Sequence, residues 1–66
     1  MQLQINQNGA WRNCLSYPAA RDAEVRYHAV RLARAADVKL RVLNDDGQVV
    51  TWWTADEGWT TPRRQS

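Results

Sequence analysis

The first part of the chain alternates polar and apolar side chains around a single turn signal. Over residues 2–7, Leu3 and Ile5 fall on one side of an extended chain, which is the period of a half-buried strand. Asn8 and Gly9 follow, and both residues tolerate a positive φ. The pattern therefore predicts a β-hairpin whose second strand runs through residues 10–16.

The register of this hairpin has two solutions, and a shift of one residue turns a whole strand over. A two-residue loop at Asn8-Gly9 would set Ile5 opposite Arg12. A three-residue loop over residues 7–9 sets Ile5 opposite Trp11 instead. We favour the three-residue loop because it gathers the apolar side chains of this region on one face, namely Leu3, Ile5, Trp11 and Leu15.

Residues 16–36 have the features of a helix and of its start. A Ser-Tyr-Pro sequence at 16–18 is typical of a helix start, and residues 19–36 contain no Gly or Pro. Apolar residues recur at helical spacing, at Val25, Ala29, Leu32 and Ala36, with Ala23, Tyr27 and Val30 beside them. We expect Val25, Val30 and Leu32 to anchor the helix on the sheet. The opposite side is expected in water and is mainly basic, with Arg21, Glu24, His28, Arg31 and Arg34.

A second hairpin is predicted after the helix. Residues 38–43 alternate again, residues 45–47 supply the turn chemistry of Asp-Asp-Gly, and residues 48–54 return. With a three-residue loop, Val42 pairs with Val50, and Leu40 pairs with Trp52. These two pairs would form the face that meets the helix.

Trp53 is the most informative residue of this hairpin. Adjacent strand residues point to opposite faces, so a buried Trp52 would place Trp53 on the uncovered face. Its expected neighbours there are Lys39, Arg41, Leu43 and Val49. An exposed apolar patch on a sheet marks an interaction surface, and Trp and Arg are enriched where interfaces hold their binding energy. The alternative is that the stems of Lys39 and Arg41 simply cover the indole.

Together these elements predict an α+β protein, with an antiparallel sheet of four strands in the order ββαββ and one helix packed on one face. A single ββαββ domain is expected over residues 1–61, since 66 residues leave room for one core only. Residues 59–61 leave open a fifth, short edge strand, which Pro62 would end. Residues 62–66 are predicted to be a flexible C-terminal tail.

The titratable residues form no recognisable catalytic or metal-binding set. Cys14 is the only cysteine, so no internal disulfide forms, and no Cys/His cluster suits zinc. We expect Cys14 on the sheet face away from the helix and His28 on the outer side of the helix, so that the two do not meet. Turn chemistry, rather than a cation site, explains the acids of the later loops, Asp45, Asp46, Asp56 and Glu57. No enzyme activity, cofactor or metal is predicted.

The hydropathy of the chain predicts no membrane association. No segment approaches the ~20 apolar residues of a membrane span, and the start of the sequence lacks the basic and apolar regions of a signal peptide. The expected location is the cytoplasm, which for a phage-encoded protein means the cytoplasm of the host.

The C-terminal half contains the run Leu40-Arg41-Val42, a turn at Gly47, an aromatic residue at Trp52, and the run Asp56-Glu57-Gly58-Trp59. This pattern, over about a third of the 66 residues, resembles some phage-encoded anti-CRISPR proteins, and it also suits short bacterial ββαββ domains of unknown function. The resemblance implies a small phage or prophage inhibitor that occupies a surface of a large host complex without catalysis. No site residue is carried over from it.

We therefore predict a non-enzymatic protein-binding module, an inhibitor or accessory protein whose partner-binding residues are Trp53, Lys39, Arg41, Leu43 and Val49. The alternative is a nucleic-acid-binding protein that uses helix and tail arginines, Arg21, Arg31, Arg34, Arg63 and Arg64. A net charge of +2 is too small to favour nucleic acid by itself. A two-fold homodimer through the sheet face or an edge strand is also expected, because so short a chain has little apolar area of its own.

Overall fold

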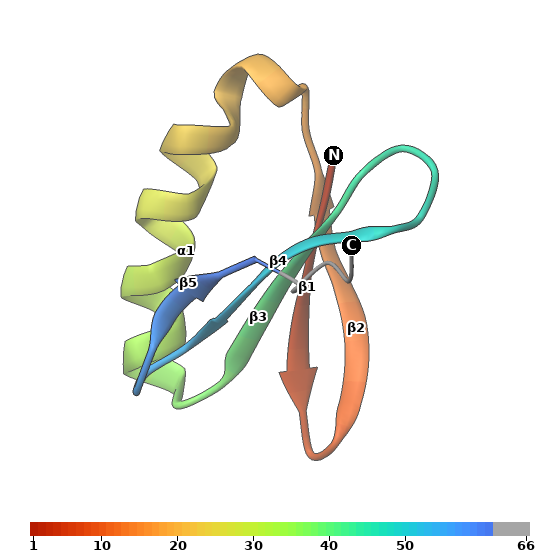
Figure 1. The fold of residues 1–66 in the computed structure, drawn as a ribbon. Coiled ribbons are helices and arrows are strands. Elements are labelled where there is room, and N and C mark those ends of the chain that lie inside the picture. Colours follow the sequence, from red (N-terminus) through yellow and green to blue (C-terminus); the bar gives the residue numbers. More distant parts are fainter. Residues whose placement is uncertain (62–66) are drawn as a thin grey trace.

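The computed structural model describes residues 1–61 and has one helix along one face of a five-stranded antiparallel sheet (Figure 1). Strands β1 (Gln2–Gln7) and β2 (Ala10–Ser16) come first. A 3-10 turn at Ala19–Arg21 leads into α1 (Asp22–Ala36). Strands β3 (Lys39–Leu43), β4 (Val49–Thr54) and β5 (Gly58–Thr60) follow.

The elements follow one another as ββαβββ, and the strands lie side by side in the order β2-β1-β3-β4-β5. This arrangement confirms the predicted α+β class with one helix on an antiparallel sheet. Strand β5 is the fifth strand that the sequence left open. β2 and β3 both pair with β1, so α1 carries the chain across β1 and leaves β2 at one edge of the sheet. The expected tail at 62–66 lies outside the described residues.

The first hairpin turns through two residues instead of three. Asn8 and Gly9 have φ angles of 55° and 82°. A positive φ at both positions belongs to the type I′ turn, whose twist matches that of the paired strands. Ile5 therefore lies opposite Arg12, and Trp11 points to the other face. The favoured three-residue loop is wrong, because the geometry of the Asn-Gly turn outweighs the collection of apolar side chains on one face.

Strand β2 contains a bulge at Cys14. Asn13 pairs with Gln4 and Leu15 pairs with Leu3, so Cys14 is the extra residue. The bulge returns Leu15 to the side of the sheet that faces α1, and Cys14 lines the space on that same side. The prediction that Cys14 lies on the face away from the helix is wrong for this reason.

The second hairpin has the predicted three-residue loop, closed by a hydrogen bond from the Asn44 amide to the Gln48 carbonyl at 2.9 Å. Leu43 pairs with Val49 as expected. Val42 then pairs with Thr51, so a bulge follows and Val50 is the extra residue of β4. Beyond the bulge, every side chain of β4 lies on the face opposite to the predicted one.

The bulge at Val50 exchanges the faces of the two adjacent tryptophans. Trp53 lies opposite Leu40 and is 2% exposed, whereas Trp52 lies opposite Arg41 and is 36% exposed. The prediction of a buried Trp52 and an exposed Trp53 is therefore wrong. Thr51 takes a second buried position of β4, and its hydroxyl donates a hydrogen bond of 2.8 Å to the carbonyl of residue 60.

Helix α1 meets the core through alanines. Ala29 and Ala33 are 4% and 1% exposed, while Leu32 is 69% exposed. Val25 and Val30 are half-buried and pack against the core, as expected of anchors. The prediction of Leu32 as a third anchor is wrong, because the line of closest approach runs through Ala29 and Ala33 and leaves Leu32 to one side.

Two arginines explain this orientation of α1. The Arg26 guanidinium lies over the Trp59 ring, 5.1 Å from its centroid, and the Arg34 guanidinium lies over the Trp53 ring at 5.3 Å. A cation over an indole face is worth about 0.5–1 kcal/mol at an exposed site. Both contacts draw this side of the helix towards β4 and β5. We expected the Arg34 side chain to contact only water, but it packs against Trp53.

Tyr17 fixes the start of the helix to the sheet. Its hydroxyl donates a hydrogen bond of 2.6 Å to Asp22 Oδ1, and the ring is buried in the core. Burial, and then the hydrogen bond and charge of Asp22, raise the pKa of Tyr17 above its usual range. Arg26 Nε lies 2.8 Å from Asp22 Oδ2, an ion pair that lacks the alignment of a hydrogen bond.

Candidate functional site

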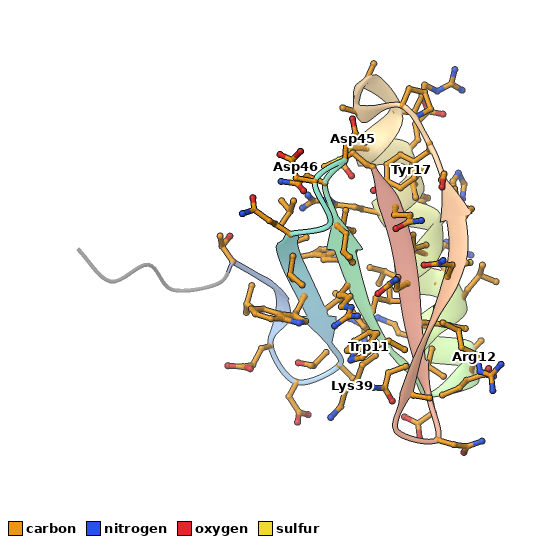
Figure 2. The ribbon with its side chains drawn as sticks, turned by 90° about the vertical axis from the view of Figure 1, so that its right-hand side faces the viewer. Trp11, Arg12, Tyr17, Lys39, Asp45 and Asp46 are labelled. Carbon is orange, nitrogen blue, oxygen red and sulfur yellow. The ribbon has the colours of Figure 1, made fainter. Side chains whose placement is uncertain are left out.

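Within residues 1–61, no helix covers the face of the sheet away from α1, and we call this face the open face (Figure 2). Residues in register across all five strands form one row on this face. Gln4 pairs with Asn13 on one side and with Arg41 on the other, and Trp52 pairs with Arg41 and Thr60. The row therefore runs, from β2 to β5, through Asn13, Gln4, Arg41, Trp52 and Thr60.

Arg41 is held at the centre of this row by two contacts, and Asn13 holds one of the residues that it contacts. Arg41 Nε donates a hydrogen bond of 2.6 Å to Gln4 Oε1, and the Gln4 amide donates one of 2.6 Å to Asn13 Oδ1. The guanidinium also stacks over the Trp11 ring, 4.3 Å from its centroid. A guanidinium fixed in this way loses less side-chain entropy when it binds a partner than a free one does.

A shorter second row lies beside the first. Asn6 pairs with Trp11 on β2 and with Lys39 on β3. Trp11 and Lys39 lie towards the same end of the sheet in Figure 2, and the acidic turn with Asp45 and Asp46 lies at the other end. The two rows together contain two cations, two tryptophans and uncharged polar residues, without a carboxylate. The open face therefore suits a surface that offers hydrogen-bond acceptors or negative charge.

The predicted partner-binding residues are only partly on this face. Lys39 and Arg41 lie on it, as expected. Trp53 is in the core and Leu43 is 8% exposed, so neither offers a side chain to a partner, and Val49 is half-buried. Sequence reasoning missed Trp11 and Trp52, together with Gln4 and Asn13, which hold Arg41. The Asn8-Gly9 turn was the available clue for Trp11, because the two-residue loop turns Trp11 to this face.

The helix arginines proposed for nucleic acid each have a partner within the chain. Arg21 Nε lies 2.8 Å from Glu24 Oε1, and Arg34 stacks on Trp53. Arg31 lies over the Tyr27 ring, 5.9 Å from its centroid. Arg63 and Arg64 lie outside the described residues.

Cys14 and His28 line one and the same groove between β2 and α1, which again places Cys14 on the helix side of the sheet and not on the expected far side. The remaining lining is apolar except for Arg21 and Glu24, which pair with each other. A cysteine nucleophile also needs a positioned base and donors for the developing oxyanion. The groove lining offers an apolar surface rather than that arrangement.

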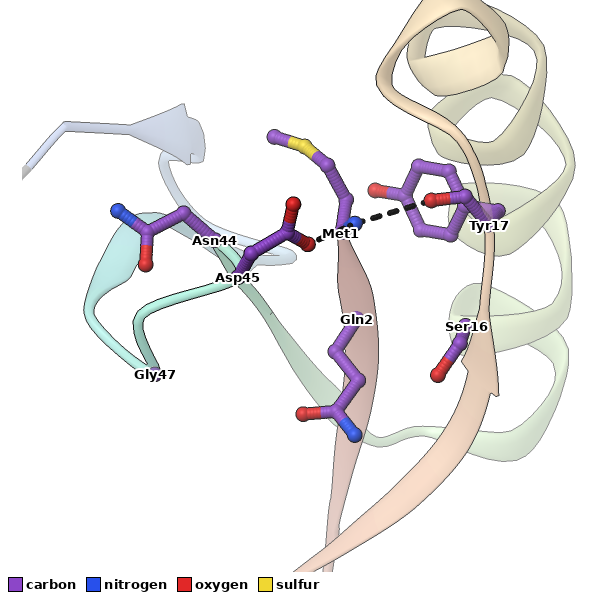
Figure 3. Close-up of a pocket in the computed structure, with 7 residues that line it drawn as sticks. All are labelled: Met1, Gln2, Ser16, Tyr17, Asn44, Asp45 and Gly47. Carbon is purple, nitrogen blue, oxygen red and sulfur yellow. Dashed lines mark hydrogen bonds and ion pairs between the residues drawn. The ribbon is translucent and has the colours of Figure 1, made fainter.

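A polar pocket of about 450 Å³ lies where the β3–β4 turn meets the start of β1 (Figure 3). The α-amino group of Met1 donates hydrogen bonds to the Tyr17 carbonyl at 2.9 Å and to Asp45 Oδ1 at 3.1 Å. Ser16 and Asn44 are among its other lining residues. The two charged groups of the pocket, the α-amino group of Met1 and the carboxylate of Asp45, thus pair with each other.

Over residues 1–61, no cluster of three or more His, Cys, Asp or Glu residues is placed to hold a metal ion. The described part of the chain also contains no helix that is long and apolar enough to cross a membrane. Comparisons of the chain with protein-family models, with curated proteins and with solved structures found no match.

Proposed function

We propose that this chain is a non-enzymatic protein-binding module that acts by occupying a partner surface with its open face. The observation that carries the proposal is the centre of that face, where Arg41 stands between Trp11 and Trp52 and is fixed by Gln4, which is itself hydrogen-bonded to Asn13. Trp and Arg are the residues that most often dominate the binding energy of protein interfaces. A role as a small inhibitor or accessory protein follows from this mode of action.

The chemistry of the face describes the surface it fits. Arg41 and Lys39 would meet carboxylates or backbone carbonyls, and the exposed part of Trp52 would enter a shallow apolar depression next to them. Gln4 is hydrogen-bonded to both Arg41 and Asn13, and these bonds already fix the side chains of the row. The row can therefore bind a partner protein without a rearrangement of the sheet.

A protein partner is favoured over a single-stranded nucleic acid by the state of Trp11. Proteins that bind single strands stack successive bases on free aromatic faces. One face of the Trp11 ring is already covered by Arg41, so Trp52 is the main indole of the open face left for stacking. The helix arginines are engaged in contacts within the chain as well.

The test is an affinity capture from extracts of the source cell with three immobilised proteins. These are the unmodified chain, Arg41→Gln, and the control Tyr27→Ser, whose exposed aromatic ring lies on α1 away from the open face. We expect a protein that the chain and Tyr27→Ser retain equally and that Arg41→Gln retains at least about tenfold less. Equal retention by all three proteins would contradict the proposal.

A parallel titration with single- and double-stranded oligonucleotides at low salt addresses the rival function. We expect no binding that depends on Arg41. Binding that weakens steeply with salt and is lost in Arg41→Gln would assign the open face to nucleic acid instead.

A further inference from the structure

The Arg41 guanidinium has one edge bound within the chain and one edge open to a partner. Its Nε–H is used in the 2.6 Å hydrogen bond to Gln4 Oε1, and one side of its plane lies over the Trp11 ring. Among residues 1–61, neither terminal nitrogen of Arg41 has a hydrogen bond or a carboxylate partner. Arg41 is half-buried, and in that part of the chain Arg26 Nε is the one buried side-chain nitrogen or oxygen without a hydrogen bond. Both terminal nitrogens of Arg41 are therefore open to solvent.

The shape of this open edge favours a carboxylate over a carbonyl group. The terminal nitrogens of a guanidinium form a planar fork that matches the two oxygens of a carboxylate, whereas a backbone carbonyl offers a single oxygen. Gln4 and Trp11 already orient the fork of Arg41, so a group that binds there has fewer side-chain rotamers to order. The open edge of Arg41 is thus a prepared site for a carboxylate.

A second cation stands beside this fork. Lys39 lies two residues before Arg41 in β3, on the same face of the sheet, and its side chain is exposed. Within the described residues 1–61, the Lys39 ammonium has no carboxylate partner. A lysine carries its charge on a flexible four-carbon stem, which reaches a group bound at the neighbouring position of the same face. A carboxylate at the fork of Arg41 is therefore attracted by two positive charges.

Acidic turns at both ends of the open face restrict the occupant to an isolated carboxylate. Asp46 lies in the turn between β3 and β4, at the end of the sheet opposite to Lys39 (Figure 2). Asp56 and Glu57 lie in the turn between β4 and β5, which follows the end of β4 nearest Lys39. None of these three carboxylates has an ion-pair partner among residues 1–61. A run of acids or a nucleic-acid backbone across the face would meet like charge at both ends, whereas one carboxylate at the centre avoids both turns.

We propose that the partner presents to Arg41 and Lys39 the side chain of a single aspartate or glutamate, with no other acid next to it. This inference rests on the proposed function, because it names the partner group that the open face binds. The carboxylate oxygens accept hydrogen bonds from the two terminal nitrogens of Arg41, and the Lys39 ammonium lies beside them. The contact fixes where the partner sits on the face.

The lysine content of the chain allows a direct test. Lys39 is the only lysine among the 66 residues, so apart from the α-amino group it is the one amine that a carbodiimide can join to a carboxylate in contact with it. The complex retained in the affinity capture is treated with a water-soluble carbodiimide, and mass spectrometry of the digest identifies the linked residues. We expect an amide bond between Lys39 and one aspartate or glutamate of the retained protein. Lys39→Arg keeps the charge without the amine, and should give no such link per retained chain.

Arg41→Lys gives an independent readout, because it keeps the charge and removes the fork. It should retain the partner about tenfold less than the unmodified chain, and circular dichroism checks that it is folded. Retention that depends on Arg41 without any link from Lys39 to a carboxylate overturns this inference and leaves the proposed function standing. Full retention by Arg41→Lys does the same, since charge alone then suffices. A loss of affinity of about 1000-fold between about 50 and 200 mM salt also overturns it, because it marks a run of acids. If the unmodified chain retains no protein, both proposals are overturned.

Discussion

Both faces of the sheet have contacts between tryptophan and arginine, but these contacts have different roles on the two faces. Under the helix, Trp53 and Trp59 lie beneath Arg34 and Arg26. On the open face, Trp11 lies against Arg41, and Trp52 is next to Arg41 in register. The helix-facing pair is part of the core or packs against it, while Trp52 is 36% exposed. The four tryptophans thus divide into a pair that stabilises the fold and a pair available for binding.

The difference shows that burial, rather than residue type, decides what a tryptophan–arginine contact does. Arg34 and Arg26 orient a helix, because their tryptophans belong to strands that the helix covers. Arg41 is oriented by its surroundings, because Gln4 and Trp11 hold it on a surface that nothing else in the described chain covers. The predictions below separate these two roles.

The largest effect is expected for Trp53→Ala. Removal of a buried tryptophan costs about 3–5 kcal/mol, most of the stability of a domain of this size. Trp52→Ala, one residue away, should cost less than about 1 kcal/mol because the side chain is on the surface. Urea unfolding followed by circular dichroism measures both. Similar losses for the two variants would show that the faces of Trp52 and Trp53 are assigned incorrectly.

The next largest effect on stability is expected at Tyr17, which lies on the helix-facing side of the sheet. Its pKa is raised in the folded chain by burial and by Asp22. The unfolded phenol ionises near pH 10, so the free energy of unfolding should decrease as the pH rises above about 10. Below that pH the stabilising contribution of the neutral phenol is fully present. Urea unfolding between pH 8 and about 11 should show a flatter pH dependence for Tyr17→Phe. An identical slope for both proteins argues against the buried Tyr17–Asp22 contact.

A smaller loss is expected for Gly9→Ala in the first hairpin. Gly9 has a φ of 82° and no atom near an added Cβ, so the cost is backbone strain of about 1–2 kcal/mol. The substitution tests the turn that sends Trp11 to the open face. Urea unfolding gives the magnitude, with Ala10→Gly as the control for a change at the neighbouring strand position. A gain in stability for Gly9→Ala would mean that the turn is not the one described.

The class of the fold was within reach of the sequence, whereas the open face was not. The fold class follows from patterns that extend over whole elements, namely alternation in residues 2–7 and 38–43 and an uninterrupted helix at 22–36. A shift of one residue in a strand does not remove such a pattern. The faces depended on two bulges, at Cys14 and Val50, each of which adds one residue to a strand. Neither position carries a Gly or another residue that marks a bulge, so periodicity placed Trp52 and Trp53 on the wrong sides.

The smallest effect on stability separates the two kinds of arginine. Arg34→Gln removes a cation over Trp53 and should cost about 0.5–1 kcal/mol. Arg41→Gln should cost a similar amount, yet only Arg41→Gln should lose the captured partner. Unfolding and capture are measured on the same preparations. Loss of the partner in both variants would indicate a general effect of destabilisation rather than a binding face.

The central claim is that the open face around Trp52 contacts another protein. Its most direct test places the photoreactive residue p-benzoylphenylalanine at position 52 in the source cell, with position 27 on α1 as the matched exposed aromatic control. We predict a covalent adduct with a protein from position 52 that is absent from position 27 and lost when Arg41→Gln is added. Equal adducts from both positions, or none from position 52, would contradict the claim.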